Sequence, residues 1–191
     1  MRRLAAFVVL SLLLAGAALA ASPEHFVERV QGRFDAIRAA GASGRDAACR
    51  SLVSDLFDTG AVAEGTGGPL WKTLPASAKT ALRVAVGSRL AVECVDVAER
   101  PATGAGVVRR VKETADGVRV TVQFPGEGGA NGAVFVWTLR AGGALGFTAR
   151  DLSVDGRGLV ATLRADLEAA LAVHEGNIAA AIADLGRSRR R

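Results

Sequence analysis

Residues 116–124 read Asp-Gly-Val-Arg-Val-Thr-Val-Gln-Phe. The Asp-Gly pair is a strong hairpin signal, because the type I′ hairpin turn needs a positive φ at both central positions. From Val118 to Phe124, apolar and polar residues alternate, which is typical of a strand with one buried face and one exposed face. The stretch therefore predicts a β-hairpin, with residues 107–114 as the strand before the turn.

Two more strands are predicted after this hairpin. Residues 133–140 are apolar on both faces, with Phe135, Trp137 and Leu139 on one face and Val134 and Val136 on the other. This pattern predicts a central strand that is covered on both sides. Gly142-Gly143 then marks a second tight turn, and residues 145–154 form the fourth predicted strand.

The segments before and after these strands carry apolar residues at helical spacing. We expect helices from Pro23 to just before Gly41, over residues 45–57 and 75–97, and, after the strands, over residues 158–175 and 177–185. Segment 59–69 contains four glycines and is predicted to be mainly loop. Four antiparallel strands packed by separate helices predict an α+β fold.

The N-terminus has the three parts of a cleavable secretion signal. Met1-Arg2-Arg3 is the positive start, residues 4–14 are the apolar run, and Ala18-Leu19-Ala20 is the small-residue cleavage site. A membrane anchor is the alternative, because an uncharged stretch of about 20 residues can span a bilayer. We expect residues 1–20 to be a signal peptide, residues 21–186 to form a single domain, and the protein to be periplasmic.

The positive charge is concentrated at the two ends of the chain. The net charge is +5 and the pI about 10.2, but six of the positive charges are terminal, namely Arg2, Arg3, Arg187, Arg189, Arg190 and Arg191. Without these six the net charge is −1. We therefore expect no basic face across the domain and no nucleic-acid binding.

The arginine-rich end, residues 187–191, follows the last apolar stripe and is predicted to be a disordered tail. One interpretation is a solvated end that only aids solubility. The other is docking to an anionic membrane surface or to an acidic patch on a transporter partner, since basic residues are attracted to such surfaces.

Two cysteines, Cys49 and Cys94, remain after the signal. Each falls on the apolar stripe of its predicted helix, so a disulfide between them is expected in an oxidising compartment. Two buried free thiols are the alternative. A zinc site is not expected, because the cysteines are far apart and only His25 and His174 could join them.

Catalytic constellations are not evident in the sequence, and neither an enzyme nor a cofactor is expected. Asp55 with Asp58, or Asp151 with Asp155, could act as acid–base pairs. However, both pairs flank turns, where aspartates usually accept hydrogen bonds from backbone groups. His174 is interpreted as a polar group at a helix end.

Two blocks of sequence resemble a known family. The first is Phe57-Asp58 followed by Gly68-Pro-Leu-Trp-Lys-Thr-Leu-Pro-Ala-Ser77 and a long helix. The second is Asp151-Leu-Ser-Val-Asp-Gly-Arg-Gly-Leu-Val160, followed by Arg164 and Leu167. In their order and context, these blocks resemble the MlaC family of periplasmic phospholipid-binding proteins, also called toluene-tolerance auxiliary proteins.

The resemblance implies an NTF2/cystatin-like sheet wrapped by helices, with an apolar pocket for acyl chains. It also implies a carrier that passes phospholipid between an outer-membrane lipoprotein complex and an inner-membrane ABC transporter complex. We expect a monomer. The residues expected to line the lipid pocket are inward-facing ones of the sheet and helices: Leu70, Leu82, Val86, Leu90, Val120, Val122, Val134, Val136, Phe147, Leu159 and Leu163.

Three alternatives remain open. The ligand could be another apolar lipid, such as a hopanoid. The domain could also be a ligand-free periplasmic interaction module whose helices pack tightly on the sheet. Finally, it could be an NTF2-like enzyme, which would carry titratable groups deep in its interior.

Overall fold

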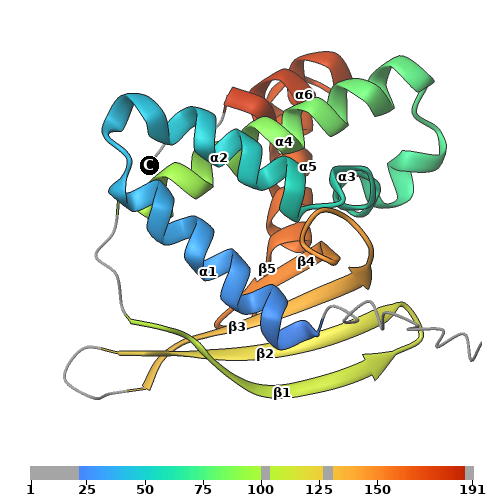
Figure 1. Ribbon diagram of the computed structural model, residues 1–191. Helices are drawn as coiled ribbons and strands as arrows, with labels where there is room; N and C mark the ends of the chain where they lie inside the picture. Colours follow the sequence, from blue (N-terminus) through green and yellow to red (C-terminus); the bar gives the residue numbers. More distant parts are fainter. Residues whose placement is uncertain (1–21, 100–103, 127–130, 188–191) are drawn as a thin grey trace, which may run out of the picture.

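The sheet is an antiparallel meander in which each strand pairs with the next one along the chain. The structure, a computed structural model, describes residues 22–99, 104–126 and 131–187 (Figure 1). Its strand order is β1-β2-β3-β4-β5. The strands are β1 (Val107–Thr114), β2 (Gly117–Pro125), β3 (Asn131–Ala141), β4 (Phe147–Val154) and β5 (Arg157–Gly158).

The prediction of four strands is wrong by one, because β5 forms a second small hairpin with β4. The turn between them is Asp155-Gly156, and both residues have positive φ, at 50° and 81°. Ser153 pairs with Gly158 and Val154 with Arg157. A strand of two residues is too short to show any alternation, so the pattern of the sequence could not reveal it.

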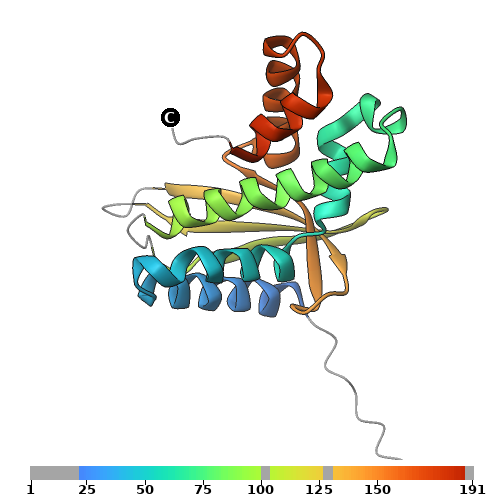
Figure 2. The same ribbon diagram turned by 90° about the horizontal axis from the view of Figure 1, so that it is seen from above.

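The helices all lie on the same side of the sheet, as Figures 1 and 2 show. They are α1 (Pro23–Ala39), α2 (Ala42–Leu56), α3 (Thr59–Gly67), the 3₁₀ helix η1 (Gly68–Lys72), α4 (Ala76–Ala98), α5 (Leu159–Val173) and α6 (Ile178–Arg187). The α+β class is therefore confirmed. No helix in the described part of the chain is long and apolar enough to cross a membrane.

Helix α3 replaces the loop that was predicted for residues 59–69. Asp58 is its N-cap, and its carboxylate accepts a hydrogen bond from the backbone N–H of Ala61 at 2.9 Å. Val62 and Ala63 are fully buried. Glycines have a low helix propensity, but tertiary packing outweighs it here. The reason is that one face of this short helix is buried in the core.

The prediction for β3 is correct in its central position and wrong about its second face. Val120 and Val122 pair with Trp137 and Phe135, so these four share the face that the helices cover. Val134 and Val136 lie on the opposite face, which no described helix covers (Figure 1). Neither valine is fully buried. The apolar residues on this second side of β3 therefore point away from the core.

The disulfide between Cys49 and Cys94 is confirmed. It joins α2 to α4 with a Cα–Cα distance of 5.7 Å, inside the range that a disulfide requires. Both residues are at most 6% exposed. The bond therefore fixes two helices of the covering layer to each other within the core.

Residues 1–20, the predicted signal peptide, lie outside the described residues, as do Arg189, Arg190 and Arg191 of the predicted tail. Arg187 is different, because it is the last residue of α6 and pairs with Asp184 at 2.7 Å.

Candidate functional site

The covered side of the sheet is an apolar surface with aromatic residues at its centre. We call it the inner sheet face; it comprises Val118, Val120, Val122, Phe124, Phe135, Trp137, Leu139, Phe147, Ala149 and Leu152. Phe26 of α1 is fully buried against it, edge-on to Trp137 at 5.8 Å and to Phe147 at 6.1 Å between ring centroids. Such edge-to-face pairs are favourable because the positive edge of one ring meets the negative face of the other.

Burial is not uniform across the inner sheet face. Val120, Val122 and Leu139 are fully buried, whereas Phe124, Phe135 and Leu152 are only half-buried although they pack against the core. The rings of Phe124 and Phe135 stack on each other at 4.7 Å, tilted by 54°. A large apolar side chain that remains partly accessible on a helix-covered face offers contact area to an apolar ligand.

The same half-buried character extends to the segments beside the sheet. Phe57, which follows α2, lies 6.3 Å from Trp137, and Leu159 begins α5. Both pack against the core without being fully buried. Phe57 is held there because it forms a parallel bridge with Ala149, whose carbonyl accepts from the N–H of Asp58 at 3.0 Å.

The residues predicted to line a pocket divide into three groups. Most lie in the core or against it: Leu82, Val86, Leu90, Val120, Val122, Phe147, Leu159 and Leu163. Leu70 is in η1 and 41% exposed. Val134 and Val136 lie on the uncovered side of the sheet, so they do not share a space with the first group. The structure thus brings eight of the eleven residues together.

Sequence reasoning missed Phe124, Phe135, Trp137 and Leu152 as candidate site residues. The signal was present, because Phe124 follows Val120 and Val122 in the same alternation. Phe135 and Trp137 also form one alternating set. Which set of β3 shares a face with Val120 depends on the register between the strands, and a shift of one residue would exchange the two faces.

The aspartates considered as acid–base pairs bind backbone groups or a guanidinium instead. Asp151 Oδ1 accepts from the N–H groups of Leu152 and Val160, at 2.9 and 3.0 Å. Asp155 accepts from Val134 at 2.8 Å, and Asp55 pairs with Arg33 at 3.0 Å. The interpretation as turn and helix caps therefore holds for three of the four residues, and Asp55 is an ion-pair partner.

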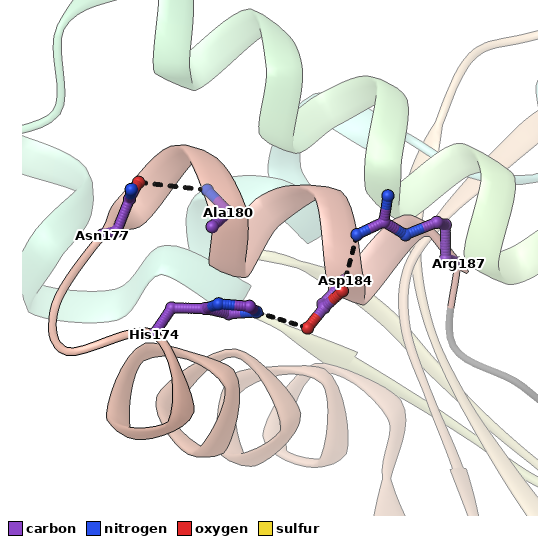
Figure 3. Close-up of polar contacts among 5 residues, drawn as sticks. All are labelled: His174, Asn177, Ala180, Asp184 and Arg187. Carbon is purple, nitrogen blue, oxygen red and sulfur yellow. Dashed lines mark hydrogen bonds and ion pairs between the residues drawn. The ribbon is translucent and has the colours of Figure 1, made fainter.

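His174 lies at the end of α5 and contacts α6 (Figure 3). Its Nε2 is 2.5 Å from Asp184 Oδ2, and Arg187 donates to the other oxygen of this carboxylate at 2.7 Å. The hydrogen bonds from Arg187 and His174 hold the pKa of Asp184 below its ordinary value. This group connects the last two helices and faces no apolar hollow, so it is structural.

Two shallow hollows open on either side of α4. The larger, about 390 Å³, lies between α4 and α6 and includes Ala81, Val84 and Ile182 in its lining. The smaller, about 270 Å³, lies between α2 and α4 and includes Arg50, Val53 and Val84. Val84 borders both and is 65% exposed. Both hollows are formed by helix residues and lie away from the inner sheet face.

Polar groups are scarce in the interior. Among the described residues, Thr66 is the one polar residue that is fully buried, and its hydroxyl donates to the carbonyl of Val62 at 2.8 Å. The described residues also contain no cluster of three or more His, Cys, Asp or Glu side chains that could hold a metal ion. The inner sheet face can therefore offer apolar contact but little polar recognition.

Comparison with solved structures shows that the fold occurs in other proteins. No family model matches the chain, and no curated protein sequence matches it. Its fold is similar to that of a phospholipid-binding protein from Ralstonia solanacearum, whose structure was solved in complex with a phospholipid. The TM-score is 0.61 over 86% of this chain and 90% of that chain, with 14% sequence identity. This likeness shows a common fold.

Proposed function

We propose that the protein is a periplasmic lipid carrier that holds phospholipid acyl chains against the inner sheet face. The single observation that carries the proposal is the fold shared with a protein solved in complex with a phospholipid. The half-buried Phe124, Phe135 and Leu152 are where we place the first contact with the acyl chains. The covering helices and the sheet then form an NTF2/cystatin-like pocket.

The chemistry of the interior supports an apolar ligand. Each CH₂ group removed from water contributes about 0.8 kcal/mol, so two acyl chains can be held without polar contacts. A polar head group would remain in water. The described interior, in which Thr66 alone is polar and buried, suits this mode of binding better than it suits catalysis on a polar substrate.

The direct test is extraction of lipid from natively purified protein, followed by mass spectrometry. We expect about one phospholipid per chain. A triterpenoid in the extract would instead identify a carrier of another apolar lipid, such as a hopanoid. Protein that yields no lipid and takes none up from phospholipid vesicles would refute the carrier function and favour a ligand-free interaction module.

The transport route is the second part of the proposal. We propose that the carrier exchanges phospholipid with an outer-membrane lipoprotein complex and an inner-membrane ABC transporter complex, as the family resemblance implies. The test is transfer of labelled phospholipid from the loaded carrier to vesicles that contain the purified transporter. Equal transfer to vesicles without transporter would show that no such partner is needed.

A further inference from the structure

The uncovered face of the sheet carries a group of cations. They belong to three strands and come together only when the strands pair. Lys112 on β1 pairs directly with Arg119 on β2. Arg110 is two residues before Lys112 on β1, and Arg140 is two residues after Thr138, the β3 residue that pairs with Arg119. Alternation therefore places both arginines on the same face. All four side chains are exposed. We call Arg110, Lys112, Arg119 and Arg140 the basic sheet face.

This cluster corrects the expectation that the domain has no basic face. The net charge of the chain without its ends is near zero because acidic residues elsewhere balance these four cations. Net charge therefore says little about the local field. Four positive charges on adjacent strands, about 5 Å apart from strand to strand, produce a positive potential over this part of the surface.

No ion pair neutralises the basic sheet face within the described residues. None of the four cations forms an ion pair there. The acid that shares their face is Asp151, which lies on the strand next to Arg140 and two strands from Arg119. Its carboxylate is not paired with either arginine and accepts a hydrogen bond from the N–H of Val160 at the start of α5. Because like charges directly opposite on neighbouring strands are destabilising, the Lys112–Arg119 pair opposes the stability of the sheet.

The aromatic residues indicate which kind of anionic partner this face suits. Phe124, Phe135, Trp137 and Phe147 all lie on the inner sheet face, and no described strand carries an aromatic residue on the opposite face. Protein interfaces usually depend on a few buried aromatic anchors. An anionic bilayer instead attracts several basic residues that lie together on an exposed surface, without such anchors.

We propose that the basic sheet face docks the protein on the surface of a bilayer rich in anionic phospholipid. Docking in this orientation directs the helices away from the bilayer. The contact is electrostatic and reversible, because each basic residue contributes a factor of about 5 in affinity at low salt and the contribution is screened as salt increases. This inference does not depend on lipid being bound inside the protein.

The lysines offer a direct footprint of the docked face. The chain contains three, Lys72, Lys79 and Lys112, of which only Lys112 lies on the sheet. Lys72 is in η1 and Lys79 in α4, on the helical side. We would acetylate the full-length protein with and without vesicles of phosphatidylcholine containing phosphatidylglycerol. We expect Lys112 to be protected several-fold while Lys72 and Lys79 remain reactive.

Charge-matched double variants test the energetics. Lys112→Gln with Arg119→Gln should weaken vesicle binding about 25-fold at low salt, while Lys72→Gln with Arg50→Gln, two exposed cations on the helical side, should have little effect. Circular dichroism would verify that both variants are folded. The proposal would be overturned if the two variants lost the same affinity or if neither lost any. It would also be overturned if the unmodified protein bound equally well to vesicles with and without phosphatidylglycerol. The same measurements on a chain that ends at Arg187 distinguish the contribution of the basic sheet face to vesicle binding from that of the arginine-rich end.

Discussion

The guanidinium of Arg164 donates two hydrogen bonds to the carbonyl oxygen of Gly65, from Nε at 3.1 Å and from Nη2 at 2.6 Å. Gly65 lies in the last turn of α3, where carbonyl groups have no partner within the helix. Arg164 belongs to α5, so one side chain caps α3 and joins the two helices through residues that are 99 positions apart in sequence. This arginine is the one that follows the second sequence block, and the contact gives it a structural role.

Arg164→Met should therefore destabilise the fold. Hydrogen bonds from a charged donor to a partly buried acceptor are worth more than neutral ones, and we expect a loss of about 1–2 kcal/mol in the free energy of unfolding. Urea denaturation measures it. Arg157→Met, at an exposed position of β5, is the control and should change little. Equal stability of the two variants would contradict the capping role.

Gly65 and Val160 are a second contact between α3 and α5. A Cβ on Gly65 would lie 2.7 Å from Val160 Cγ1, which is too close for the β-branched valine to accept without moving. We expect Gly65→Ala to destabilise the protein by about 1 kcal/mol or more. In a Val160→Ala background the same change should be neutral or stabilising, because alanine favours a helix by up to about 1 kcal/mol over glycine. If the effects of Gly65→Ala and Val160→Ala on the free energy of unfolding were simply additive, this explanation would be contradicted.

The Cys49–Cys94 disulfide closes a span of 45 residues. In the chain-entropy model such a link stabilises a fold by roughly 4 kcal/mol, less if the unfolded chain is compact. We expect reduction to lower the urea midpoint by a corresponding amount without abolishing folding. The Cys49→Ala, Cys94→Ala variant is the control, because its midpoint should not respond to reductant. Thiol titration of denatured, unreduced protein should find no free thiol.

The ion pairs of Asp184 should give a pH-dependent contribution to stability. Because the folded state lowers the pKa of this carboxyl below 3.8, the stabilisation is present above that value and is lost as pH falls through the lowered pKa. Asp184→Asn should therefore lower Tm at neutral pH and make no difference in strong acid. Asp46→Asn, at an exposed position of α2, should not change Tm at either pH. A Tm difference for Asp184→Asn that persists in strong acid would exclude this explanation.

Adjacent residues on β3 test the lipid site, because Phe135 and Val136 point to opposite faces. Phe135→Asn should remove most of the lipid recovered from purified protein, since it places a polar group on the inner sheet face. Val136→Asn should leave the lipid content unchanged. If Phe135→Asn does not fold, Phe124→Asn provides the same test on β2. Equal lipid content in the inner-face variant and in Val136→Asn would place the ligand elsewhere.

The elements that the sequence predicts best are those with a regular pattern. The alternation is unbroken from Val118 to Phe124, and the helical spacing of apolar residues is unbroken along α4. Both elements, and the inward position of Cys94, can therefore be predicted. Helix α3 could not be predicted, because its glycines suggest a loop and its stability comes from Asp58 and from packing against α5.

The candidate site is less predictable than the fold. Val134 and Val136 have the same apolar character as Phe135 and Trp137, and only the pairing of β3 with β2 shows which pair faces the helices. The degree of burial is also a tertiary property. Phe124 and Val122 are two residues apart on one face, but the helices cover Val122 completely and Phe124 only in part.

The order of the strands has a consequence for how the chain folds. Each strand of the meander pairs with its neighbour in sequence, so the sheet can grow hairpin by hairpin without waiting for distant segments. Both cysteines precede β1, and the disulfide can therefore join α2 to α4 before the sheet has been completed. The two halves of the domain are each built largely from local contacts, and they meet where Phe26 packs on Trp137 and where Phe57 bridges Ala149. Helix α5 follows the sheet and adds the contacts of Arg164 and Val160 with α3.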